Sequence, residues 1–244
     1  MPQSWKSVTA LPALSPDELQ IWRITLAAPA TPTEPYLHHL TPNEQSRASR
    51  LRAGQVRLQF VVARTALRTL LGNLLSAPPK EVPIDTGTHG KPSTPGISFN
   101  VAHTSDTILI ALCRNSEVGI DVESLTREVD PMEIARHSFA PAESQALADL
   151  TNPLDRQRAF FRLWTRKEAV IKADGRGLSL PLDSFEVPLI ESAVAVPISI
   201  PATPSTPTAT YFVSDLYLRD DRAAAFAVKS FDISLSLFEF PFAM

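Results

Sequence analysis

Two long helical segments, each followed by short strand-like segments, constrain the fold of this sequence most strongly. Residues 56–75 (VRLQFVVARTALRTLLGNLL) carry a wide apolar face, and a second helix is predicted from about 154 to 173. Strand-like segments follow both helices, at 97–102, 107–113 and 118–123 after the first and at 183–189, 211–218 and 223–229 after the second. The pair at 97–102 and 107–113 is predicted to form a hairpin, and so is the pair joined around residues 219–221. This repeated order predicts an α+β fold of two similar halves, residues 1–117 and 118–244, with antiparallel strands packed against helices.

Proline, threonine and glycine mark the ends of the elements. A helix is predicted to begin at Pro42 with Thr41 as its N-cap, because proline is accepted in the first turn and a threonine oxygen can accept a hydrogen bond from a helix N–H group. Gly54 separates that helix from the next one. Residues 27–35 and 199–208 are rich in proline and threonine without any hydrophobic period, which predicts surface loops.

The composition is that of a globular protein and excludes several classes of function. The 244 residues carry a net charge of −3, so the basic surplus typical of nucleic-acid binding is missing. The one cysteine, Cys113, closes an apolar run, which predicts a buried thiol and a reducing compartment. We see neither a signal peptide nor the roughly 18 continuous apolar residues of a membrane helix, and we expect a cytoplasmic protein.

Two carboxylates lie on one face of the strand VGIDVE at 118–123. Asp121 and Glu123 are two residues apart and point to the side opposite to Val118, Ile120 and Val122. Such a pair is found on strand edges that face solvent. It also suits Mg²⁺, which prefers oxygen ligands and relieves the repulsion between the two acids. The strand alone leaves both interpretations open.

The segment WTRKEAVIKADGRG places Trp164, Glu168 and Lys172 four residues apart on one helical face. Glu168 would be a third carboxylate if this helix lies against the strand at 118–123, and Lys172 would then face an anion held by the metal. The alternatives are a surface ion pair between Glu168 and Lys172 and a tryptophan that belongs to the core. Gly175 and Gly177 are suitable residues for ending the helix.

Basic side chains elsewhere could complete an anion site. Lys91 projects from a Gly-Lys-Pro turn, and His103 directly follows a strand, although a single histidine there is often a structural residue. Arg57, Arg64 and Arg68 form one stripe on the helix at 56–75, and such stripes are usually solvated. Arg64 is flanked by apolar residues, and a partly buried arginine requires an anion. Three acids with these basic groups predict phosphoryl-type transfer on a phosphate-rich substrate.

Four segments together resemble the surfactin-synthetase-type 4′-phosphopantetheinyl transferases: GKP (90–92), FNVAH (99–103), VGIDVE (118–123) and LWTRKEAVIKADGRGL (163–178). They follow the family's order and cover the chain from about Thr41 to the strand near 187. The resemblance implies transfer of the phosphopantetheine arm of coenzyme A to a serine of an apo carrier protein, with release of 3′,5′-ADP. It also implies Mg²⁺, with Mn²⁺ as a substitute, a monomer, and coenzyme A bound between two α+β halves.

The resemblance assigns roles to individual residues. Asp121, Glu123 and Glu168 match the metal ligands, and Lys172 matches the lysine on the α-phosphate of coenzyme A. Lys91, His103 and Arg47 are expected to contact coenzyme A, with His103 toward its 3′-phosphate and Arg47 toward the nucleotide. Arg64 is expected to join them because a partly buried arginine requires an anion. Glu168 is the expected general base for the serine, and Lys172 is the expected acid for the leaving ADP. Glu143 matches an acid of unassigned role that precedes a helix.

The chain departs from the family pattern at two positions. Ala102 stands where the family often has serine, so the hydroxyl contact of that serine is absent. Glu44 stands where a lysine is common, which is expected to weaken nucleotide contacts from that helix unless Arg64 or Arg50 compensates.

The expected partners are acyl or peptidyl carrier domains of fatty-acid, polyketide or non-ribosomal peptide synthases. The candidate docking segments are the helix predicted around 131–150 and the segment before Trp164. Two other functions stay open. One is a non-catalytic module that binds coenzyme A or a carrier protein, which the intact acids argue against. The other is a metal-dependent phosphodiesterase that needs no carrier.

Overall fold

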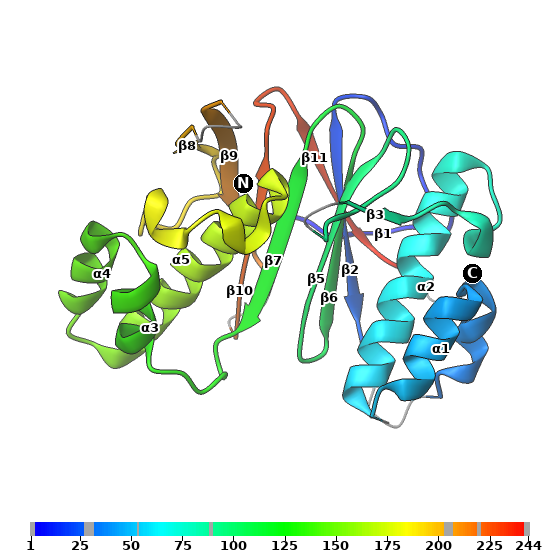
Figure 1. Ribbon diagram of the computed structural model, residues 1–244, viewed down its shortest axis with the longest axis horizontal. Helices are drawn as coiled ribbons and strands as arrows, with labels where there is room; N and C mark the ends of the chain where they lie inside the picture. Colours follow the sequence, from blue (N-terminus) through cyan, green and yellow to red (C-terminus); the bar gives the residue numbers. More distant parts are fainter. Residues whose placement is uncertain are drawn as a thin grey trace.

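The structure, a computed structural model, describes residues 3–26, 32–52, 54–87, 90–202, 207–218 and 221–241. Two sheets lie face to face, and a long helix covers the outer face of each (Figure 1). Helix α2 (Gln55–Leu75) packs on the first sheet, and helix α5 (Pro153–Asp174) packs on the second. The predicted α+β class and the two long helices are therefore confirmed.

The first sheet has five strands, in the order β1 (Lys6–Ser7), β11 (Ser234–Glu239), β2 (Glu18–Thr25), β6 (Thr107–Cys113) and β5 (Ser98–Thr104). Strands β5 and β6 form the predicted hairpin, and β6 also pairs antiparallel with β2. Strand β11, near the end of the chain, pairs parallel with β2 and β1. A segment from beyond residue 118 thus completes the first sheet, and the division of the chain at 118 stays a prediction.

The second sheet has four antiparallel strands, in the order β7 (Val118–Ser124), β10 (Arg222–Val228), β9 (Ala209–Asp215) and β8 (Val196–Ile200). The hairpin predicted around 219–221 corresponds to the β9–β10 pair, although residues 219 and 220 lie outside the described part. Parts of the two predicted Pro/Thr-rich loops, residues 27–31 and 203–206, also lie outside it. Strands β3 (Asp85–Thr86) and β4 (Pro92–Ser93) form a separate small pair.

The strand predicted at 183–189 is wrong. Residues Leu182–Ser184 form a short 3₁₀ helix, η4, and the following residues pair with no strand of the described chain. Side chains, rather than a neighbouring strand, form the hydrogen bonds of this segment's backbone groups. The N–H group of Val187 donates to Glu143 Oε1 at 2.8 Å, and Lys167 Nζ donates to the carbonyl oxygens of Leu182 and Phe185.

The remaining helices are α1 (Pro42–Arg50), α3 (Pro131–Ser138) and α4 (Pro141–Ala148), with further 3₁₀ helices η1 (Glu34–His39), η2 (Pro79–Glu81) and η3 (Gly177–Ser179). Helix α1 begins as predicted: the Glu44 N–H donates to Thr41 Oγ1, and the Thr41 N–H donates back to the Glu44 carboxylate. The single helix predicted around 131–150 is two helices, because Pro141 keeps the residue before it out of the helical region.

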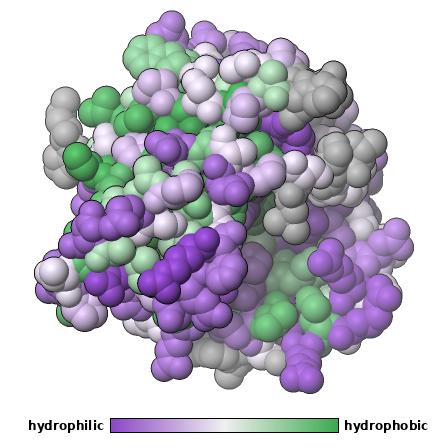
Figure 2. Space-filling view, turned by 60° about the vertical axis from the view of Figure 1, so that its left-hand side comes forward, coloured by the Kyte–Doolittle hydropathy of each residue, from purple (hydrophilic) through white to green (hydrophobic). Residues whose placement is uncertain are grey.

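The space between the two sheets is a hydrophobic core to which every second residue of β7 contributes. Val118, Ile120 and Val122 are all buried there, as the alternation predicted. Cys113 is also buried in this core, and burial raises the pKa of its thiol. Hydrophobic residues on the face shown in Figure 2 occur in small groups and in the wall of a hollow, with hydrophilic residues around them. None of the helices within the described residues is long and apolar enough to span a membrane.

Helix α5 comes unusually close to strand β7 at Gly119. A Cβ atom at this position would lie 2.0 Å from the Ala169 carbonyl oxygen and 2.4 Å from the Ala173 nitrogen. Any side chain there would therefore push the helix off the strand. This close approach is what brings the polar residues of α5 against those of β7.

Candidate active site

An ion pair between α5 and β7 forms the centre of the candidate site. Lys172 Nζ lies 2.5 Å from Asp121 Oδ1, and it also donates to the Ile120 carbonyl oxygen at 3.3 Å. Asp121 is only 6% exposed, so the interpretation as a solvent-facing strand edge is wrong for this residue. Burial raises the pKa of the Asp121 carboxyl, and the neighbouring Lys172 opposes that rise.

The two other predicted acids lie close to this pair. Burial raises the pKa of Glu168, Lys172 opposes the rise, and the negative charges of Asp121 and Glu123 add to it. Burial and Asp121 likewise raise the pKa of Glu123, while Arg127, at 2.9 Å from the Glu123 carboxylate, lowers it. The Glu168 carboxylate makes no hydrogen bond to any other described residue. The fold thus brings together the three acids that the sequence placed on two separate elements.

The fit of this cluster to a divalent metal ion depends on its arrangement and on its donor atoms. No group of three or more His, Cys, Asp or Glu residues within the described chain already has the arrangement of a metal site. One atom nevertheless requires a partner: Asp121 Oδ2 is buried and has no hydrogen bond in this part of the chain. Three neighbouring carboxylates supply the oxygen ligands that Mg²⁺ prefers. The residues therefore fit a hard cation chemically.

Basic side chains line a pocket of about 350 Å³ between α2 and β5. Arg47 of α1, Arg64 of α2 and His103 of β5 share its wall with the apolar side chains of Phe60 and Leu67. Desolvation and the positive charge of Lys172 lower the pKa of His103, although the residue is exposed overall. His103 thus lies within electrostatic reach of the Asp121–Lys172 pair and also lines the basic pocket.

The three arginines on one face of α2 (Arg57, Arg64 and Arg68) differ in how closely they approach an acidic partner. Arg68 is buried and lies 2.6 Å from Glu44 Oε2, whereas Arg64 Nε lies 3.8 Å from Glu44 Oε1. Arg68 also donates to the carbonyl oxygens of Pro79 and Val82, so it is a structural residue. Arg57 is paired more loosely with Glu34, at 3.5 Å. Of the arginines on the stripe, Arg64 is the one that lines the pocket.

Lys91 lies apart from this pocket. Its Nζ donates to Glu117 Oε2 at 2.9 Å, to the Ala173 carbonyl oxygen at 2.9 Å and, more weakly, to the Val118 carbonyl oxygen at 3.4 Å. It lines a different, larger pocket of about 900 Å³, together with Asp174 and Gly175. The expected contact of Lys91 with coenzyme A stays a prediction.

Three other residues considered in the sequence, Trp164, Ala102 and Arg50, lie outside the acid cluster and the basic pocket. The Trp164 ring packs with Phe139 and Phe160, at centroid distances of 6.3 and 6.0 Å, so the core interpretation holds for it. Ala102 is buried between the two sheets and does not line the basic pocket. Arg50 is exposed and donates to the Ser46 carbonyl oxygen in its own helix.

Two buried ion pairs on α5 were not foreseen. Arg166 binds both carboxylate oxygens of Asp215, at 2.8 and 2.7 Å, and Lys167 lies 2.7 Å from Glu143. Glu143 also accepts from the N–H group of Ala140, so it joins α4, α5 and the segment at 187. Arginine and lysine within an apolar stretch of helix indicate that buried ion pairs exist. The sequence does not identify their partners, because these lie far away along the chain.

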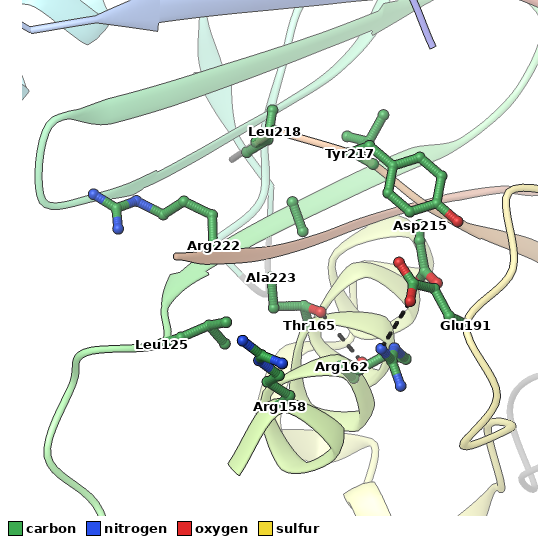
Figure 3. Close-up of a pocket in the computed structure, with 12 residues that line it drawn as sticks. Leu125, Arg158, Arg162, Thr165, Glu191, Asp215, Tyr217, Leu218, Arg222 and Ala223 are labelled. Atoms are coloured by element: carbon green, nitrogen blue, oxygen red, sulfur yellow. Dashed lines mark hydrogen bonds and ion pairs between the residues drawn. The ribbon is translucent and has the colours of Figure 1, made fainter. Parts of the chain in front are cut away.

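A further pocket, of about 470 Å³, lies beside α5 and the ends of β9 and β10. Figure 3 shows Arg158 and Arg162 projecting from the same helix, with Arg162 paired to Glu191 at 3.2 Å. None of the predicted site residues lines this pocket. We assign no part of the candidate site to it.

Comparisons with known proteins agree with this arrangement. The model of the "4′-phosphopantetheinyl transferase superfamily" matches residues 117–227, which include β7 and α5. The 4′-phosphopantetheinyl transferase HetI of Nostoc sp. (strain PCC 7120) is 32% identical over 221 residues, covering 88% of this chain and 89% of that protein. The 4′-phosphopantetheinyl transferase Sfp of Bacillus subtilis is 29% identical, covering 64% and 69%, and AcpT of Salmonella typhi is 31% identical, covering 58% and 79%.

Proposed function

This chain belongs to the 4′-phosphopantetheinyl transferase superfamily, and on that premise we propose that it moves the phosphopantetheine arm of coenzyme A onto a serine of apo carrier proteins. It is an enzyme of the transferase class. The co-product would be 3′,5′-ADP, and the reaction would depend on Mg²⁺, with Mn²⁺ as a substitute. Action as a monomer, a cytoplasmic location and service to polyketide, fatty-acid or peptide synthases stay predictions.

The observation that carries the proposal is the cluster of Asp121, Glu168 and Lys172 on two closely packed elements. A pyrophosphate is an anion that needs a cation and hydrogen-bond donors, and phosphoryl transfer depends mainly on positioning and charge neutralisation. Lys172 supplies one charge, and its Nζ already lies 2.5 Å from Asp121. The basic pocket with Arg47, Arg64 and His103 supplies further positive charge for the phosphates of a nucleotide.

Asp121, Glu123 and Glu168 would hold the metal ion. When bound, a divalent ion neutralises charge on the pyrophosphate oxygens. Asp121 Oδ2 has no hydrogen bond within the described residues, and this supports the assignment, because a buried carboxylate oxygen without a partner costs free energy.

Two residues of α5 would carry the proton transfers. Glu168 accepts the proton of the carrier serine while the serine oxygen forms a bond to the β-phosphorus of coenzyme A. The bond from that phosphorus to the bridging oxygen breaks, and the electron pair leaves with 3′,5′-ADP, which Lys172 neutralises and protonates. Glu168 and Lys172 are one helical turn apart on α5, so both proton-transfer groups face the same site.

The nucleotide would be held by His103, Arg64 and Arg47, which line the basic pocket. The family resemblance directs His103 toward the 3′-phosphate, and its position in the basic pocket with Arg47 and Arg64 supports that role. Glu44 does not cancel the charge of Arg64 completely, since its shorter contact is with Arg68. Arg64 therefore keeps positive charge for a phosphate.

The proposal is tested by intact-mass spectrometry of apo acyl- and peptidyl-carrier proteins incubated with this protein, coenzyme A and Mg²⁺. A mass gain equal to one phosphopantetheine group, abolished by EDTA, is the expected result. Release of ADP without any carrier would instead indicate a phosphodiesterase. Binding of coenzyme A without any mass gain on several carriers would indicate a non-catalytic module.

A further inference from the structure

Three side chains from the first half of the chain bind the backbone of β7 and α5. Asn100 and Ser98 of β5 bind β7, and Lys91 binds both the start of β7 and the last turn of α5. We call these the bridging contacts. Each one joins segments that the sequence keeps apart, and each one ends on a backbone atom rather than on a side chain of the site.

Asn100 and Ser98 replace a missing strand neighbour. Strand β7 is the edge of the second sheet, so the N–H groups on its outer side have no strand partner there. The N–H group of Ile120 donates to Asn100 Oδ1 at 3.0 Å, and the N–H group of Val118 donates to Ser98 Oγ at 3.3 Å. Asn100 is only 8% exposed, and water could not easily replace it. These two side chains therefore fix β7 along the edge of the first sheet.

Lys91 satisfies the end of α5. The last carbonyl groups of a helix have no partner within it, and Lys91 Nζ donates a hydrogen bond to the Ala173 carbonyl oxygen at 2.9 Å. The lysine is itself fixed by Glu117 at 2.9 Å. Gly175 has a φ of 85°, and a Cβ there would lie 3.3 Å from Lys91 Cδ, so the turn after the helix leaves room for the lysine stem.

Two of the bridging contacts, from Asn100 and from Lys91, end directly beside the two residues of the central ion pair. Ile120 precedes Asp121, and Ala173 follows Lys172. We propose that Asn100 and Lys91 are positioning residues, which set the Asp121 carboxylate and the Lys172 ammonium in register for the reaction. This inference rests on the proposed function. It gives Lys91 a role different from the direct contact with coenzyme A that the family resemblance implies.

Steady-state kinetics separate the two roles of Lys91. We expect Lys91→Ala to lower kcat for carrier modification about 10-fold or more, with KM for coenzyme A changed less than about 2-fold. Glu117→Ala should show the same pattern more weakly, and Lys91→Arg should recover part of kcat. Lys80→Ala, at an exposed lysine, is the matched control and should change neither parameter. A rise in KM with kcat retained, together with an unaffected Glu117→Ala variant, would overturn the assignment in favour of a direct contact.

Hydrogen exchange tests Asn100 without any need for activity. In Asn100→Ala we expect the amides of Val118–Ser124 to exchange faster than in the unmodified chain, because an edge strand has lost its outer partner. Asn115→Ala, at an exposed asparagine, is the control and should leave that exchange unchanged. Unchanged exchange in Asn100→Ala would refute the positioning role. If the unmodified chain modifies no carrier, the proposed function fails, whereas the exchange experiment still decides whether Asn100 holds β7.

Discussion

Lys172 is paired with Asp121 of strand β7, at 2.5 Å, and not with Glu168 one turn earlier on its own helix. The contact across elements leaves the Glu168 carboxylate without a hydrogen bond to the described residues. It also gives the buried Asp121 a counter-charge at Oδ1, while Asp121 Oδ2 has no hydrogen bond to the described residues. Lys172 thus stabilises the contact between α5 and β7 and leaves Glu168 and one oxygen of Asp121 available for chemistry.

Removing Lys172 should destabilise the protein because it leaves Asp121 as an uncompensated buried charge. We expect Lys172→Met to lower the free energy of unfolding by about 1–3 kcal/mol, less than for a fully buried pair because the lysine side chain is 28% exposed. Chemical denaturation measures this loss. Adding Mg²⁺ should stabilise Lys172→Met more than the unmodified chain, and the double variant Asp121→Asn, Lys172→Met should recover part of the loss. Equal stability of single variant and unmodified chain would show that the pair contributes nothing.

Glu168→Gln should abolish turnover while coenzyme A still binds. Loss of a general base lowers kcat by about 10²–10⁴-fold, and the amide keeps the size of the carboxylate. Carrier modification followed by mass spectrometry gives kcat, and calorimetry gives the affinity for coenzyme A. Turnover of Glu168→Gln near the unmodified rate would refute Glu168 as the base.

Gly119→Ala should displace α5 from β7. The added methyl group would lie 2.0 Å from the Ala169 carbonyl oxygen, and that atom belongs to helix backbone that cannot move alone. We expect a loss of about 1–3 kcal/mol in unfolding free energy together with a fall in kcat. The control is Gly87→Ala, where a Cβ would meet its nearest atom at an ordinary 3.4 Å. Full activity in Gly119→Ala would mean that the close approach is unnecessary for the site.

The Glu44–Arg68 pair should make stability depend on acidity. Burial disfavours the charged form of Glu44, but the hydrogen bonds from Arg68 and Thr41, together with the positive charges of Arg68 and Arg64, outweigh burial and lower its pKa. A carboxyl whose pKa is lower in the folded state stabilises the protein above its unfolded pKa, and this contribution is lost as the pH falls through the folded pKa. We expect Glu44→Gln to cost about 1–3 kcal/mol at neutral pH.

Urea denaturation across the acid range checks the sign of this effect. The difference between the unmodified chain and Glu44→Gln should shrink as the pH falls below the ordinary glutamate pKa of about 4.3. A difference that stays constant or grows in acid would contradict the lowered pKa. The exposed Glu81→Gln is the matched control, with no expected change.

Local patterns were sufficient to predict much of the fold. The apolar face of α2, the hairpin of β5 and β6, the alternation along β7 and the Thr41 cap of α1 each depend on residues close together in the sequence. The i, i+4 spacing of Glu168 and Lys172 likewise follows from helix geometry alone. The same patterns failed at 183–189, where strand-like residues are held by Glu143 and Lys167 from helices far away in the sequence.

Tertiary structure alone decided which charges meet. Lys172 is 51 residues from Asp121, and Arg166 is 49 residues from Asp215, so no local period relates either pair. Gly119 decides how closely the elements of the site approach, through the absence of a side chain. Strand β11 joins the first sheet from the far end of the chain. This pairing also escapes local patterns, because pairing energy depends on proximity in space, which sequence spacing does not specify.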